Sequence, residues 1–330
     1  MDLPNSKEPT LKEQTVQQLI AWDSAWSQQH PIRITKKQKE AFLHTLEQAL
    51  QARQFETERI TVRTLITNRL LTTVCDKPAI IFTAHFDTPT IMPFWFNPFF
   101  AIFGHTRQIT ATFFLLIFLY IPTLLLPHIP LNLTWLSLIL MAVPILLAVS
   151  MISLFIPNPH NREDNTSGVL ALMTLADWLQ DKPDLRDKVQ LVFLDNEELG
   201  LLGSRGLRQV WHERGHPFHE AKIINLDCVS RGEIPLIVYH YRDAIAQQVA
   251  PFIQAHLPQA RPIDMSWLPL SDNYTFKPEK AINISFADET IVPGGYTIPR
   301  IHTPSDNQFD PERLVLLLRG LIDFVESDVR

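Results

Sequence analysis

Two long runs without a charged residue lie in the middle of this 330-residue sequence. Residues 109–126 contain no charged side chain, and after a short proline-bounded link residues 131–156 again contain none. A helix of about 20 apolar residues spans a bilayer. The first run is nearly long enough for this, and the second is longer than needed. A pair of buried helices in a soluble core is the alternative, but adjacent uncharged runs of this length are uncommon there. We therefore predict a membrane hairpin with spans at about 109–127 and 134–156.

The sequence on either side of these runs has the pattern of an α/β protein. Short apolar segments alternate with amphipathic ones. The expected strands are residues 70–74, 79–83, 188–194, 221–226, 236–239 and 281–286. The expected helices are residues 166–179, 203–212, 242–256 and 311–326. Because several strands are apolar throughout, they are typical of strands buried on both faces. We predict an α/β fold with a mostly parallel central sheet flanked by helices, plus a two-helix transmembrane insertion.

This pattern divides the chain into three parts. Residues 1–57 carry two amphipathic helical stripes and are expected to pack as N-terminal helices on the main domain. Residues 58–92 and 158–330 form that domain, and residues 93–157 form the membrane hairpin inserted into it.

Composition and charge narrow the compartment and the partners. The formal net charge of -6 does not suggest a polyanionic partner such as nucleic acid. Only two cysteines occur, Cys75 and Cys228, which is too few for a disulfide framework and fits a reducing compartment. The N-terminus lacks the apolar stretch of an export signal. Together with Arg107 and Arg162 beside the predicted spans, this places both ends and the main domain in the cytoplasm.

Polar side chains follow several predicted strands at the point where each strand ends. His85 and Asp87 follow one strand, Glu197 and Glu198 follow the next, and Asp227 follows a third. Open α/β sheets bind ligands at the carboxyl ends of their strands, so these residues are expected to meet. Residues two apart in a strand face the same side, so the Asp87 carboxylate can orient the His85 imidazole toward a metal.

Two further segments add potential ligands. Asp164 lies in an Asp-Asn-Thr-Ser-Gly segment that opens a helix, where a capping cluster is the alternative interpretation. His302 lies in a proline-bounded loop near the C-terminus. Histidine, aspartate and glutamate donors without cysteine suit catalytic zinc or a related divalent ion. Metal ions would also offset the repulsion between the adjacent carboxylates of Glu197 and Glu198.

These motifs and their order resemble the M28 family of zinc peptidases. The family pattern runs His-x-Asp, Asp-Asn-x-Ser-Gly, Glu-Glu-x-Gly, Asn-x-Asp and His-Thr. The resemblance extends from about residue 60 to the C-terminus without the hairpin, and five motifs in order make it specific. The corresponding segments here begin at His85, Asp164, Glu197, Asn225 and His302. The resemblance implies the fold of the zinc exopeptidases, in the phosphorylase/hydrolase-like class.

The resemblance also implies a role for each ligand. Asp164 would bridge two zinc ions. His85 and Asp227 would complete one site, and Glu198 and His302 would complete the other.

The same resemblance implies roles for two more residues, and this sequence differs from the family at one position. Glu197 would be the general base, and Asp87 would orient His85. Ile301 stands where many members of the family carry a tyrosine that stabilises the oxyanion. The family pattern assigns no role to Cys228, for which a buried thiol is expected.

The sequence therefore predicts a membrane-anchored zinc exopeptidase, an aminopeptidase by preference, whose partners are a peptide substrate and the lipid bilayer. One alternative is a glutaminyl cyclase-like enzyme or another amide hydrolase on the same scaffold. The other is a membrane scaffold that has kept the fold without turnover.

Overall fold

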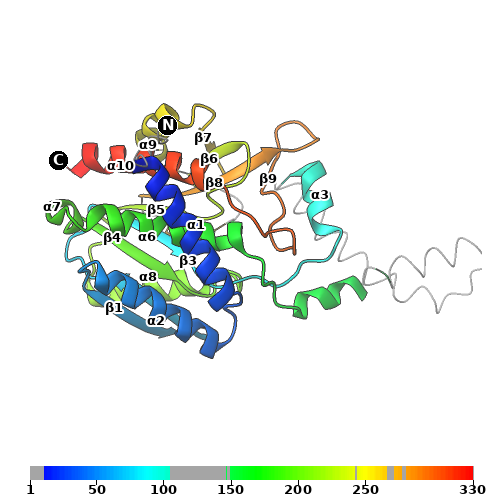
Figure 1. Ribbon diagram of the computed structural model, residues 1–330, viewed down its shortest axis with the longest axis horizontal. Coiled ribbons are helices and arrows are strands. Elements are labelled where there is room, and N and C mark those ends of the chain that lie inside the picture. The colour runs from blue at the N-terminus through cyan, green and yellow to red at the C-terminus, as the bar shows by residue number, and fades with distance from the viewer. Residues whose placement is uncertain are drawn as a thin grey trace, which may run out of the picture.

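A sheet of nine strands forms the centre of the described part of the chain in the computed structural model (Figure 1). The structure describes residues 11–104, 146, 149–241, 244–265, 271–276 and 280–329. The strand order is β1-β2-β4-β3-β5-β8-β6-β7, and β9 pairs with β8. The strands are β1 (Thr57–Arg63), β2 (Thr67–Thr73), β3 (Ile80–His85), β4 (Val189–Leu194), β5 (Lys222–Leu226), β6 (Ile234–Tyr239), β7 (Arg261–Asp264), β8 (Lys280–Glu289) and β9 (Tyr296–Thr297).

Helices before, between and after the strands cover the sheet. The longer helices are α1 (Leu11–Gln29), α2 (Lys36–Ala52), α3 (Phe96–Phe103), α6 (Gly168–Leu179), α8 (Leu202–Arg214), α9 (Ala244–His256) and α10 (Pro311–Val329). The short ones are α7 (Pro183–Arg186), η2 (Met151–Phe155), η3 (Arg162–Ser167) and η4 (Asp272–Phe276).

The sheet is mixed rather than mostly parallel. The adjacent strands β4, β3, β5 and β8 run parallel. Antiparallel pairs flank them, β2 with β4 on one side and β6 with β8 on the other. The prediction of a mostly parallel sheet therefore holds for the central strands and for the edge pair β6–β7, and is wrong for the antiparallel pairs β1–β2, β2–β4 and β6–β8.

Alternate residues of β3 face the two helical layers. Phe82 and Ala84 pack in the larger core with residues of α1, α2, α6, α9 and α10. Ile81 packs on the opposite face, in a smaller core that contains Leu207 and Trp211 of α8. Because both faces are covered, all six residues of β3 are buried. This explains why the segment reads as an unbroken apolar run in the sequence.

The inserted segment leaves and rejoins the domain at adjacent points. Ile91 donates a backbone hydrogen bond to Ile156 (2.9 Å), and Asn158 donates one to Pro89 (3.0 Å). On the entry side, α3 lies beside β9 (Figure 1). The insertion therefore begins and ends at one place on the surface of the domain.

The predicted membrane topology is not what the structure shows. Among the residues it describes, no helix has the length and apolar character needed to cross a membrane. This finding contradicts the predicted two-span localisation. The predicted spans, about 109–127 and 134–156, fall largely outside the described residues. Where the second span is described, Met151–Phe155 form a short 3-10 helix, so apolar composition alone was a poor guide to their structure.

Helix α2 connects the N-terminal segment to the centre of the sheet. It begins with a capping box, in which Gln38 Oε1 accepts from the backbone of Thr35 (2.9 Å) and Thr35 caps the Gln38 backbone. Its buried face includes a charged residue, Lys39. Lys39 Nζ lies 2.5 Å from Asp195 Oδ1, just beyond β4, and both side chains are buried.

Replacing Lys39 by methionine should lower the free energy of unfolding by about 3–5 kcal/mol, because the substitution leaves the Asp195 carboxylate buried without its cation. Lys37→Met is the matched control, since Lys37 is exposed on the same helix and its loss should change stability by about 0.5 kcal/mol or less. Urea denaturation of both variants gives the comparison. Equal losses of unfolding free energy in the two variants would show that the buried pair of Lys39 and Asp195 does not stabilise the fold.

Candidate metal centre

Three neighbouring parallel strands bring the predicted site residues to one edge of the sheet. His85 is the last residue of β3, and Asp227 follows β5 directly. Glu197 and Glu198 lie in the turn beyond β4. Since these strands run in the same direction, their carboxyl ends meet at this edge. The location is the one where open α/β sheets bind ligands.

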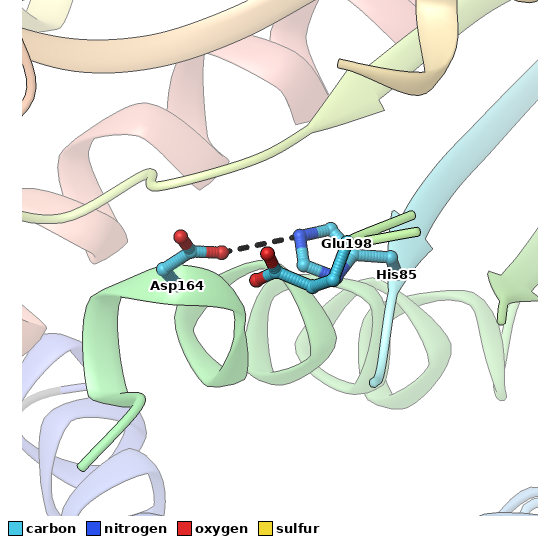
Figure 2. A group of neighbouring side chains, drawn as sticks. All are labelled: His85, Asp164 and Glu198. Carbon is cyan, nitrogen blue, oxygen red and sulfur yellow. Dashed lines mark ion pairs between the residues drawn. The ribbon is translucent and has the colours of Figure 1, made fainter. Parts of the chain in front are cut away.

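Asp164 lies between two histidines. Its Oδ1 lies 3.3 Å from Nε2 of His85, and its Oδ2 lies 2.8 Å from Nε2 of His302. Asp164 comes from the kinked η3 turn before α6, where its backbone is not helical (φ -111°, ψ 94°). Figure 2 shows its carboxylate directed toward His85, with the carboxylate of Glu198 alongside. Each oxygen of one carboxylate therefore faces a different imidazole.

The other two predicted ligands complete one group on each side. Asp227 Oδ1 lies 3.5 Å from Nε2 of His85, and Glu198 Oε2 lies 3.6 Å from Nε2 of His302. The structure thus brings all five predicted ligands together, in two groups that share Asp164. Their role in binding metal stays a prediction.

Asp87 holds the turn that carries the two glutamates. Its Oδ1 accepts from the backbone N–H of Glu197 (3.1 Å), and its Oδ2 accepts from that of Glu198 (3.3 Å). The same Oδ1 lies 3.5 Å from Nδ1 of His85. The sequence predicted only the contact with His85. In the structure Asp87 also fixes the turn beyond β4.

The chemistry of the donors fits a divalent metal. Among the described residues, neither ring nitrogen of His85 has a hydrogen-bond partner, although the side chain is fully buried. Buried Oε1 of Glu198 and Nδ1 of His302 are likewise without a hydrogen bond there. Buried polar atoms normally have a hydrogen-bond partner. These atoms are therefore expected to bind a partner beyond the described residues. Imidazole nitrogens and carboxylate oxygens are ligands suited to zinc.

Burial and the close charges together shift the pKa values of the site strongly. Burial, and then the charge of Asp164, raise the pKa of Glu198 well above its ordinary value. Burial opposes ionisation of Asp164 too, but His302 and His85 hold its pKa below the usual range. Burial also works to lower the pKa of His85, yet the surrounding carboxylates raise it well above the ordinary value.

The metal-free protein should lose stability as the pH rises from about 5 to about 8. Burial raises the pKa values of Glu163 and Asp272 to about 7, and carboxylates raise that of His302 against the effect of its burial. The folded state therefore binds more protons than the unfolded state in this window, and it loses this stabilisation as they dissociate. Urea denaturation in the presence of a chelator measures the trend. Greater stability at the higher pH would contradict these shifts.

Two charged residues that sequence reasoning missed hold the segments around Asp164. Asp306 accepts from the backbone N–H groups of Glu163 (2.8 Å) and Asp164 (3.1 Å), and it follows His302 by four residues. Buried Arg33, from the link between α1 and α2, donates to the Phe86 carbonyl and to the side chains of Asn161, just before η3, and Thr166, within it. The Asp306 position could have been noticed in the sequence beside His302. Nothing near Arg33 in the sequence marks it.

A cavity of about 200 Å³ opens beside the predicted metal ligands. Asp164, Glu197, Asp227 and His302 lie at its polar side. Its other walls are mainly apolar and include Leu236, Val238, Met265, Ile298 and Ile301.

The fold is shared with solved structures of zinc exopeptidases and glutaminyl cyclases. The aminopeptidase LapA of Legionella pneumophila superposes with a TM-score of 0.60 at 14% identity, over 98% of this chain and 77% of that chain. A glutaminyl cyclase of Bacteroides thetaiotaomicron gives 0.60 at 16% identity, over 94% and 97%. A Zn-dependent exopeptidase of Parabacteroides distasonis gives 0.60 at 13% identity, over 94% and 97%. At these identities the comparison establishes the α/β fold.

The sequence profile of peptidase family M28 matches residues 162–316, slightly less than half of the chain. The matched segment runs from just before Asp164 to beyond His302, and includes the glutamates of the β4 turn and Asp227. His85 and Asp87 lie before it. No curated protein sequence matches the chain.

Proposed function

We propose that this protein is a zinc-dependent exopeptidase of the M28 type that removes the N-terminal residue of peptides. The observation that carries the proposal is Asp164, whose two oxygens face His85 and His302 separately. One carboxylate shared between two donor groups is the arrangement needed to hold two metal ions close together. The match to the M28 profile, which includes Asp164 and His302, supports this interpretation.

The chain's own residues supply the proton transfers. When bound, zinc supplies Lewis acid chemistry, which makes water more acidic and a carbonyl more electrophilic. Glu197 lines the cavity and takes the proton of the attacking water, then returns it to the leaving amine. The Asp87 carboxylate holds Glu197 in place by accepting a hydrogen bond from the Glu197 backbone N–H.

The cavity beside the site favours an exopeptidase that accepts one apolar side chain. A dry cavity of about 150 Å³ holds a benzene molecule, so about 200 Å³ accommodates a side chain of the size of leucine or phenylalanine. Leu236, Val238 and Met265 present apolar groups to it.

Cyclisation of N-terminal glutamine is the second candidate, because the glutaminyl cyclase of Bacteroides thetaiotaomicron has the same fold with an equal TM-score. The presence of two donor groups that share Asp164, rather than a single group, favours the two-metal hydrolase.

The test is incubation of the zinc-loaded protein with peptides that begin with leucine, with N-acetyl-leucine or with glutamine. We expect release of free leucine from the first peptide only, and none after chelation. Loss of ammonia from the glutamine peptide without hydrolysis would identify a cyclase instead. Failure with every peptide would favour a protein without turnover.

A further inference from the structure

A cysteine thiol lies beside the proposed metal ligands. Cys228 follows Asp227, and adjacent residues of an extended strand point to opposite faces. At Cys228, however, φ is 58°, in the left-handed region that residues other than glycine rarely adopt. The left-handed backbone therefore interrupts the alternation of side-chain directions. Cys228 Sγ lies 3.3 Å from Asp227 Oδ1, to which it donates a hydrogen bond.

Hydrogen bonds fix the backbone that carries this thiol. The Cys228 N–H donates to Oδ1 of Asn165 (3.2 Å), the residue after Asp164. The Cys228 carbonyl accepts from the N–H of Phe286 on β8 (2.8 Å). The thiol is therefore attached to the same segments that position Asp164 and Asp227.

The sulfur forms a compact donor group with two proposed ligands. Asp164, Asp227 and Cys228 are buried, and each offers a ligand atom within 4.8 Å of the other two. An independent observation comes from His85, whose Nε2 is buried without a hydrogen-bond partner among the described residues. That nitrogen lies 3.3 Å from Oδ1 of Asp164 and 3.5 Å from Oδ1 of Asp227, the two carboxylates that flank Cys228 in this group.

We propose that Cys228 is a sulfur ligand of the metal ion held by His85 and Asp227. This inference rests on the proposed function, since it concerns the same metal site. The sulfur binds as a thiolate: the S–H bond breaks, its proton passes to solvent, and a metal–sulfur bond forms. A thiolate directs the site toward softer ions such as zinc and cadmium and away from magnesium and manganese.

Cobalt substitution tests this proposal by a spectroscopic signal that a structural role would not produce. We expect the Co²⁺-loaded wild type to show a sulfur-to-cobalt charge-transfer band in the near ultraviolet, in addition to the visible bands of bound cobalt. Cys228→Ser and Cys228→Ala should lose the band. Cys75→Ser should keep it, because Cys75, the other cysteine of the chain, donates instead to the backbone carbonyl of Asp187 (3.3 Å).

A second measurement uses ion selectivity. Cys228→Ser should weaken cadmium binding by at least about tenfold, the lower end of the loss seen when even a supporting partner of a ligand is removed, while manganese binding changes less. Equal losses for both ions would overturn sulfur ligation.

The outcomes separate this inference from the proposed function. Visible cobalt bands without the ultraviolet band in the wild type would overturn the sulfur ligand and leave the zinc site standing. A protein that binds no cobalt at all would overturn both.

Discussion

Glu197→Gln should lower kcat by about 10²–10⁴-fold while the zinc content stays unchanged, the range expected when a general base is removed. Glutamine has nearly the same shape but cannot accept the proton of the attacking water. The backbone N–H of Glu197 remains held by the Asp87 carboxylate, which the substitution does not change. Turnover of a leucyl peptide and metal analysis of the same preparation provide the measurement.

Glu220→Gln is the matched control for this substitution, because Glu220 is exposed on the surface. It should retain full activity. If Glu197→Gln lost zinc together with activity, Glu197 would be a ligand rather than the base. Full activity in this variant would remove Glu197 from the mechanism.

Asp164→Asn should remove most of the bound zinc from both positions. An amide lacks the two anionic oxygens that face His85 and His302, so each donor group loses its shared member. His302→Ala, by contrast, removes a ligand from one group only and should leave about one ion per chain. Mass spectrometry of dialysed protein gives the metal content of each variant.

Asp181→Asn controls for the loss of a negative charge, since Asp181 is exposed. It should keep the wild-type metal content. Equal zinc losses in Asp164→Asn and His302→Ala would contradict a bridging role for Asp164.

Much of the central sheet could be predicted because burial on both faces leaves a direct mark on the sequence. The six residues of β3 are all buried and read as an apolar run that ends at His85. The edges could not be predicted in the same way. The antiparallel pairing of β2 with β4 leaves no trace in either segment, and β7 has no buried residue to set a pattern.

The candidate site was predictable wherever polar residues follow such a run, as at Asp227 after β5. Its supporting contacts were not, because they join distant segments. Lys39 reaches Asn196 across 157 positions, and Arg33 reaches Asn161 across 128. The left-handed backbone of Cys228 also lies at such a long-range contact, the hydrogen bond from its N–H to Asn165. The membrane hairpin was predicted from composition alone, and the described residues contain no helix fit to cross a membrane.

The proposed function requires Asp164 to hold two metal ions, one on the side of His85 and one on the side of His302. Its most direct test is a crystal structure of the zinc-loaded protein with an anomalous difference map at the zinc absorption edge. We predict two peaks, one beside each oxygen of the Asp164 carboxylate. A single peak on one side, or peaks that are not beside Asp164, would show that Asp164 does not bridge two metal ions.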